Sequence, residues 1–267
     1  MKYARIIAIT VVSVVALFAV TASLFSRFDY RRQDREHFAG SPSAEHWLGT
    51  DALGRDRLAR ILHGARLSLS LAPAAAGLTL LLAFVFGAVP GFCGHSAERV
   101  AKIVIDLMLS LPWLFVLLMA RALLPLNTSP ASSALVTFFM LGLVGWGFPA
   151  RVLHARASRL RRSEFALSAR AAGISQARLL RIHLLPNLRP LLVTQFWIAV
   201  PVFVLAEANL SLLGLGVSEP LPSLGSLLRE MESGLSLGVD FCSITPLLLL
   251  LLIVASLQMA FQASEVN

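Results

Sequence analysis

Six predominantly apolar segments divide the chain, and they limit its possible folds more than any other feature. They cover residues 6–26, 67–92, 103–125, 132–150, 190–214 and 243–261. A helix of about 20 apolar residues crosses the hydrocarbon core of a bilayer and satisfies its own backbone hydrogen bonds there. We therefore predict an all-α, polytopic integral membrane protein with six transmembrane helices.

The composition supports this fold class. Hydrophobic residues make up 57% of the chain and charged residues 14%, whereas soluble domains have about 45–50% and about 25%. A disordered chain, a disulfide scaffold and a secreted enzyme are excluded. The isoelectric point near 10.9 we attribute to basic loops at the membrane, not to nucleic-acid binding.

Basic residues are unevenly distributed between the connecting segments, and this predicts an orientation. Of the 23 Lys and Arg residues, 13 fall in segments that we place inside the cell and nine in segments that we place outside. Basic loops favour the cytoplasm, so both termini are predicted to be cytoplasmic. The inside segments are 1–5, 93–102, 151–189 and 262–267, and the outside segments are 27–66, 126–131 and 215–242. The eight Arg of segment 27–66 lie among six acids, with which we expect local pairs.

The first apolar segment follows two basic residues, Lys2 and Arg5, as the core of a secretory signal peptide does. Its apolar run from Ile6 to Phe25 is longer than the 7–15 residues of such a core, and no A-x-A cleavage site follows. We expect this segment to be retained as a transmembrane helix.

Segment 151–189 is the longest inner loop, with nine Arg and one acid. A first short helix is predicted from Glu164, ended by Gly173 at the position after the helix cap. A second is predicted to start after Ser175 as its N-cap and to stop at Pro186.

Phe165, Ala169 and Ala172 recur at helical spacing and give the first helix one small apolar face. Two interpretations of the loop remain open from the residues alone. It is either a basic hairpin on anionic lipid or a docking element for a partner protein.

Three charged residues lie inside the apolar segments. Asp106 and Arg121 are near segment ends, so we expect them to reach interfacial water. Glu207 lies deeper, six residues after Pro201, and an ionisable group at that depth predicts a function. We expect Glu207 to line a polar cavity or to pair with another subunit.

Prolines and glycines mark other positions in the segments. Static kinks are expected at Pro73, Pro112 and Pro246, whereas Pro201 is a candidate for function. Gly87 and Gly91 form a G-x-x-x-G pair, which favours close helix packing.

The chain carries no P-loop. Its two lysines, Lys2 and Lys102, lie outside any G-x-x-x-x-G-K-[ST] pattern, whose lysine and backbone amides hold nucleotide phosphates. We expect a non-catalytic chain that holds no cofactor or metal itself.

Three stretches together resemble the C-type permease subunits of dipeptide and oligopeptide ABC importers. Residues 46–56 read H-W-L-G-T-D-A-L-G-R-D and are followed by G-A-R-L-S-L at 64–69. Residues 164–173 read E-F-A-L-S-A-R-A-A-G, followed by L-L-P-N at 184–187, and are similar to the cytoplasmic EAA loop of that family. Residues 205–216 read L-A-E-A-N-L-S-L-L-G-L-G. The resemblance covers about residues 5–261.

The resemblance implies a permease subunit of an ATP-driven, binding-protein-dependent importer in a bacterial inner membrane, most simply for di- or oligopeptides. Residues 1–66 would form a transmembrane helix with an outer loop, and 67–267 the five-helix permease domain. Its partners would be a second, homologous permease, one or two kinds of P-loop ATPase that bind ATP and Mg, an extracytoplasmic binding protein and the lipid bilayer. Coupling to the ATPase would use Glu164, Phe165, Ala169, Arg170, Ala172, Gly173, Pro186 and Asn187. Glu207 and Pro201 would belong to the translocation pathway.

The sequence departs from the family pattern in the motif itself. Leu167 and Ser168 stand where that motif has its glutamate and first alanine, and Glu164, three residues earlier, would supply the acid. Two alternatives remain: a permease for nickel or a metal chelate, and a self-sufficient ion-coupled carrier with Glu207 as its proton site.

Overall fold

The computed structural model describes residue 10 and residues 28–123, 129–234 and 241–265. Contacts divide the chain into two compact units. Unit 1 comprises Met1–Pro73, Arg121–Phe138 and Val200–Asn267, and unit 2 comprises Ala74–Ala120 and Phe139–Ala199. The predicted span 6–26 lies outside the described residues except for Thr10.

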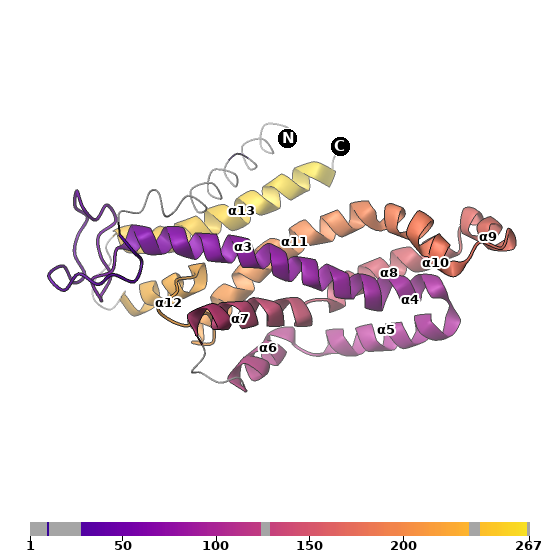
Figure 1. The fold of residues 1–267 in the computed structure, drawn as a ribbon, viewed down its shortest axis with the longest axis horizontal. Coiled ribbons are helices and arrows are strands. Elements are labelled where there is room, and N and C mark those ends of the chain that lie inside the picture. Colours follow the sequence, from indigo (N-terminus) through magenta and orange to yellow (C-terminus); the bar gives the residue numbers. More distant parts are fainter. Residues whose placement is uncertain (1–9, 11–27, 124–128, 235–240, 266–267) are drawn as a thin grey trace. The chain divides into compact units, whose positions relative to one another are not determined.

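All secondary-structure elements in these described ranges, apart from two isolated β-bridges, are helices (Figure 1). In chain order the helices are α3 Arg57–Ala83, η1 Phe84–Ala88, α4 Val89–Cys93, α5 His95–Ser110, α6 Trp113–Ala122, α7 Pro130–Val144, α8 Gly147–Arg161, α9 Glu164–Ala171, α10 Gln176–Leu179, η2 Leu180–Leu184, α11 Leu185–Leu212, α12 Leu224–Gly234, η4 Phe241–Ile244 and α13 Thr245–Glu265. Both η1 and η2 are π-helical turns, and η4 is a 3₁₀ turn.

Four continuous helical stretches in the described residues are long and apolar enough to cross a membrane. They are Arg57–Cys93, Pro130–Arg161, Gln176–Leu212 and Cys242–Met259. A fifth candidate is the broken pair Ser96–Ser110 and Trp113–Ala122, whose halves meet at 76°. Large apolar side chains such as Leu81, Phe139 and Leu251 are exposed on these helices, as expected for surfaces that face lipid or another subunit.

The third predicted segment, 103–125, is not one kinked helix. Leu111 is extended, with φ −82° and ψ 132°, and separates α5 from α6. The ring of Pro112 disfavours helical geometry at the residue before it, which explains the break. The prediction of a static kink at Pro112 was therefore wrong.

The second span begins ten residues earlier than predicted, at Arg57. Asp56 precedes it and accepts a 2.7 Å hydrogen bond from the backbone N–H of Ala59, which satisfies one of the free donors at the helix start. The expected boundary between residues 66 and 67 thus falls inside α3.

Close helix packing at the predicted glycine pair builds the core of unit 2. A Cβ on Gly87 would lie 2.5 Å from the carbonyl oxygen of Ala150, and one on Gly91 would lie 2.9 Å from that of His154. These contacts bring η1 and α4 against α8, where Phe92 and Leu153 are fully buried. The prediction from the G-x-x-x-G pair is confirmed.

The predicted second helix of the inner loop does not stop at Pro186. The chain is helical without interruption from Gln176 to Leu212. Pro186 cannot donate to the carbonyl of Ile182, four residues earlier, and the π turn η2 lies directly before α11. A π turn changes the hydrogen-bond register, so the proline is accommodated and this prediction was wrong. Likewise, α8 extends through residues placed in the loop and ends only at Arg161.

Candidate functional site

Helix α9 lies beyond the ends of α8 and α10 in unit 2 (Figure 1). Ala166 is fully buried and Ala169 packs against the core cluster. Phe165 and Leu167 remain 41% and 54% exposed, and Ala172 is exposed as well. The predicted apolar face is therefore split, because Ala169 faces inward while Phe165 and Ala172 stay accessible.

The end of α9 is as predicted. Gly173 has φ +75°, a conformation that costs side-chain-bearing residues free energy. Its N–H donates to the carbonyl of Arg170 at 2.9 Å, and the N–H of Ile174 donates to that of Ala169 at 3.1 Å. This pair of bonds is the Schellman motif. A Cβ on Gly173 would meet nothing within 4 Å, so the requirement for glycine is one of backbone conformation.

Arg170 turns toward its own unit. Its Nη2 donates to the carbonyl oxygen of Phe92 at 3.2 Å, and its guanidinium lies 5.4 Å from the centroid of the Phe92 ring. Gln176, at the start of α10, donates to the same carbonyl oxygen at 3.3 Å.

Two other predicted residues meet at His183 in η2. The rings of Phe165 and His183 have centroids 5.4 Å apart. Asn187 donates from Nδ2 to the His183 carbonyl oxygen at 2.7 Å. The exposed Glu164 begins α9, and Pro186 lies next to Asn187 at the start of α11.

Ion pairs connect segment 93–102 with segment 151–189 inside unit 2. Arg161 is nearly buried and lies 2.8 Å from Glu98, with Arg162 at 4.0 Å from the same carboxylate. Further along α5, Asp106 pairs with Arg151. Segments 93–102 and 151–189, both predicted to be cytoplasmic, therefore lie at the same end of unit 2.

In unit 1, Glu207 is fully buried on α11 and accepts three hydrogen bonds. Ser211 Oγ and Ser223 Oγ each donate to Oε1 at 2.7 Å, and the N–H of Gly225 donates to Oε2 at 3.3 Å. Ser223 directly precedes α12, and Gly225 lies in its first turn. The carboxyl thus holds α12 against α11, and Pro201 is buried earlier on the same helix.

The H-W-L-G-T-D-A-L-G-R-D stretch forms a tight loop before α3. Gly49 and Gly54 have φ values of +72° and +74°, and Cβ atoms there would lie 2.3 Å and 2.0 Å from backbone oxygens. His46 Nδ1 lies 2.8 Å from Asp56, and both side chains are buried. These contacts explain the two glycines, the histidine and the last aspartate of the stretch.

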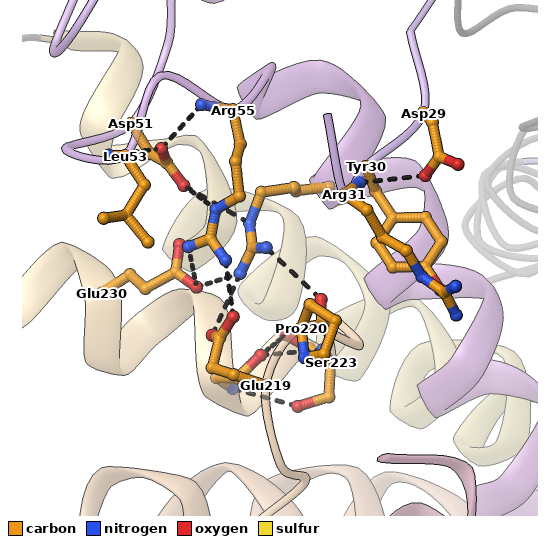
Figure 2. Close-up of polar contacts among 12 residues, drawn as sticks. Asp29, Tyr30, Arg31, Asp51, Leu53, Arg55, Glu219, Pro220, Ser223 and Glu230 are labelled. Atoms are coloured by element: carbon orange, nitrogen blue, oxygen red, sulfur yellow. Dashed lines mark hydrogen bonds and ion pairs between the residues drawn. The ribbon is translucent and has the colours of Figure 1, made fainter. Parts of the chain in front are cut away.

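An ionic cluster joins this loop to α12 and the segment before it. Arg55 lies 2.6 Å from both Asp51 and Glu219. Figure 2 shows these side chains together with Glu230. Arg60 is fully buried and pairs with Glu219 at 3.2 Å and with Glu230. The partners of both arginines come from segments 27–66 and 215–242, both predicted to be outside the cell. These two segments therefore lie at the same end of unit 1.

The two glutamates of the cluster have opposite pKa shifts. Burial, together with the hydrogen bond that protonated Glu230 donates to Glu219, raises the pKa of Glu230 to about 7, while Arg60 opposes the shift. Although burial works against it, Arg60 and Arg55 hold the pKa of Glu219 below its usual value. The cluster borders a cavity of about 680 Å³ that Arg57, Leu227 and other residues of unit 1 line.

Arg121 does not reach interfacial water as predicted. It is 5% exposed, and its Nη2 donates to Ser133 Oγ at 2.6 Å. Its Nε donates to the carbonyl oxygen of Leu215 at 3.1 Å, just beyond the C-terminal end of α11. Oxygen atoms of the protein, and not water, accept the hydrogen bonds of Arg121. The prediction that Arg121 reaches interfacial water was therefore wrong.

Comparison with known proteins identifies the family to which these features belong. Residues 83–265 match the family described as binding-protein-dependent transport system inner membrane component. The chain belongs to this family. It is a membrane-embedded transport permease subunit, and the match includes α9 as well as Glu207.

Named relatives extend the similarity beyond that match. The oligopeptide transport system permease protein OppC of Bacillus subtilis is 31% identical over 224 residues, which are 84% of this chain and 72% of that protein. OppC of Escherichia coli is 31% identical over 249 residues, 92% of this chain and 78% of that protein. The dipeptide transport system permease protein DppC of Bacillus subtilis is 32% identical over 189 residues, 71% of this chain and 57% of that protein.

Sequence reasoning found α9 and Glu207 of this permease but missed several of their partners. Gln176 and His183 carried no motif signal. The link from Arg55 and Arg60 to Glu219 and Glu230 was also missed, since only local pairs were expected in the first outer segment. The excess of acids in the other outer segment was the one available signal.

Proposed function

We propose that this permease is a membrane subunit of an ATP-driven importer of di- or oligopeptides, supplied by an extracytoplasmic binding protein. The names of its relatives favour this substrate class. In this proposal a second, homologous permease completes the pathway, and P-loop ATPase subunits bind ATP and Mg and drive transport. The permease lies in a bacterial inner membrane with both termini in the cytoplasm.

The observation that carries the coupling part of the proposal is the construction of α9. One side of this helix is anchored in unit 2, while Phe165 and Leu167 are exposed apolar residues at its start. An apolar anchor beside small residues fits a groove on a partner protein. We assign the docked surface to Glu164, Phe165, Ala172 and Gly173. The support beneath it we assign to the inward-facing Ala169 and to Arg170, Pro186 and Asn187.

Sidedness supports the proposed orientation. Segments 93–102 and 151–189 share one side through Glu98 and Arg161, and they carry most of the predicted inner basic residues. Loops rich in Arg and Lys favour the cytoplasm. The ATPase would therefore meet α9 in the cytoplasm, where ATP is available.

A pathway role for Glu207 and Pro201 stays a prediction. In this structure three donors of its own unit surround the Glu207 carboxyl. This arrangement favours a structural role in which Glu207 anchors α12. Transport by Glu207→Gln at wild-type rates would assign the residue to structure alone.

Co-purification tests the assembly. The tagged permease is expressed from its native locus, extracted in mild detergent and analysed by mass spectrometry. The proposal predicts recovery of a P-loop ATPase and a second multi-span permease. A single species that moves solute without them would contradict the proposal and favour an ion-coupled carrier.

Variants of α9 test the coupling surface. Phe165→Asp places a charge on the proposed anchor, and Gly173→Arg adds bulk at the exposed helix end. Both should leave insertion intact but abolish the stimulation of ATP hydrolysis by the loaded binding protein. The matched controls are Phe165→Leu, which stays apolar, and Gly173→Asn, because asparagine tolerates positive φ. Stimulation that persists in Phe165→Asp and Gly173→Arg would exclude α9 from coupling.

A further inference from the structure

One backbone oxygen receives hydrogen bonds from two elements of the loop. The carbonyl of Phe92 accepts from Arg170 at 3.2 Å and from Gln176 at 3.3 Å. Arg170 lies in α9 and Gln176 begins α10. Phe92 is the next-to-last residue of α4, where helix carbonyls lack donors from their own helix. Cationic donors are favoured at this end of a helix, so the arrangement satisfies an electrostatic need of α4.

The Phe92 side chain strengthens this attachment. Its ring is fully buried in the core cluster of unit 2, and the Arg170 guanidinium lies over it at 5.4 Å. A cation over an aromatic face is attracted by the ring quadrupole. Arg170 is therefore held by both the backbone and the side chain of one residue, and it is not directed toward a partner protein.

The other described attachments of α9 lead elsewhere. The ring contact of Phe165 reaches His183 in η2, and η2 continues into α11. The buried Ala166 offers no directional bond. Hydrogen bonds fix distance and direction together. Among the described contacts, the Arg170 and Gln176 bonds connect α9 and the start of α10 directly to α4, whereas Ser158 of α8 donates separately to the Gly91 carbonyl at 3.3 Å.

We propose that Arg170 and Gln176 are positioning residues that carry a displacement of α9 to α4 through the Phe92 carbonyl. This inference rests on the proposed function, in which the ATPase displaces α9. It differs from the expectation that Arg170 pairs with an acid on the ATPase. In this assignment the ATPase pushes the exposed side of α9, and the span that runs from Arg57 to Cys93 responds.

Hydrogen–deuterium exchange on the purified complex tests the inference without knowledge of the substrate. Exchange is compared between the nucleotide-free complex and the complex trapped with ADP and vanadate. In the wild type, peptides 164–173 and 89–94 should both change. In Arg170→Met and in Gln176→Met, the change in 164–173 should persist while that in 89–94 falls at least about twofold.

Two further variants separate positioning from loss of folding. Arg170→Lys keeps a cationic donor and should restore part of the response in 89–94. Arg178→Met removes an exposed arginine of α10 and should respond as the wild type does. If Arg170→Met does not fold, Gln176→Met alone decides the question.

The outcomes distinguish this inference from the proposed function. Absence of an ATPase from the wild-type preparation would overturn both. An ATPase with an unchanged response of 89–94 in Arg170→Met and Gln176→Met would overturn only the inference. Loss of the ATPase from Arg170→Met would also overturn it, because Arg170 would then act in docking.

Discussion

Ser223 donates a 2.7 Å hydrogen bond to Glu207, although 16 residues separate them and neither is exposed to solvent. The same Glu207 oxygen accepts from Ser211 one turn along α11. Gly225 packs closely on α11, since a Cβ on this glycine would lie 2.7 Å from the Cα of Ala208. The L-A-E-A-N-L-S stretch thus forms the surface on which the start of α12 packs.

Replacing Glu207 by Gln should destabilise the permease. The amide keeps one acceptor oxygen, but its NH₂ group confronts a buried donor, at a cost of about 1–3 kcal/mol. Ser223→Ala should also destabilise the permease, by about 1–2 kcal/mol, because it removes the bond that Ser223 donates to Glu207 and the one that its Oγ accepts from the N–H of Ser226. The apparent unfolding temperature in mild detergent measures both, and the exposed Glu232→Gln is the control. Equal temperatures for Glu207→Gln and the wild type would mean that the carboxyl does not anchor α12.

Alanine should lower the stability of the permease at Gly87 and Gly91 but not at Gly77. In Gly87→Ala and Gly91→Ala the new methyl group meets backbone oxygens of α8 at 2.5 Å and 2.9 Å, and such overpacking costs about 1–3 kcal/mol. In Gly77→Ala nothing lies within 4 Å, and helix propensity favours alanine by about 1 kcal/mol. Thermal unfolding should show two destabilised variants and one unchanged or stabilised. Equal behaviour of all three would refute close packing at this pair.

Glu230 should make stability depend on pH near neutrality. Its pKa of about 7 in the folded state lies above the ordinary 4.5, so the folded state binds this proton more tightly than the unfolded state does. The resulting stabilisation is complete below about pH 4.5 and is lost as pH rises through about 7. Since the pKa of Glu219 is lowered, its own contribution changes only at more acidic pH.

Unfolding temperatures measured between about pH 5 and about pH 8 test this dependence. The wild type should lose stability as the pH rises, and Glu230→Gln should show a flatter profile because the titrating proton is absent. Glu232→Gln serves as the control on the same helix. An unaltered slope in Glu230→Gln would assign the pH dependence to another group.

Local patterns predicted the parts of this fold that depend on neighbouring residues. The end of α9 at Gly173 and the packing of Gly87 and Gly91 both follow from spacing and from the absence of a side chain. The burial of Glu207 follows from its depth in an apolar segment.

Prolines show why other parts were not predicted. Pro112 follows an extended Leu111 and breaks its segment, whereas Pro186 follows Leu185, which is helical with φ −59° and ψ −47°. The difference arises from the π turn before Pro186, a change of hydrogen-bond register that apolar periodicity does not encode.

Long-range polar partners were equally hidden. Arg121 was expected to reach water because its depth was judged along one segment, but Ser133 of α7 and the Leu215 carbonyl just after α11 supply acceptors. Arg60 and Glu230 are 170 residues apart in sequence. Such pairs depend on how the helices pack, and a single sequence carries no direct signal of that packing.

ATP-driven uptake of peptide tests the central claim most directly. The purified complex and the permease alone are reconstituted into vesicles with the binding protein outside, a labelled casein digest as substrate and ATP inside. The account predicts uptake only by the complex, only with ATP, and its loss in Phe165→Asp but not in Phe165→Leu. Uptake by the permease alone, driven by an ion gradient and indifferent to ATP, would contradict the account.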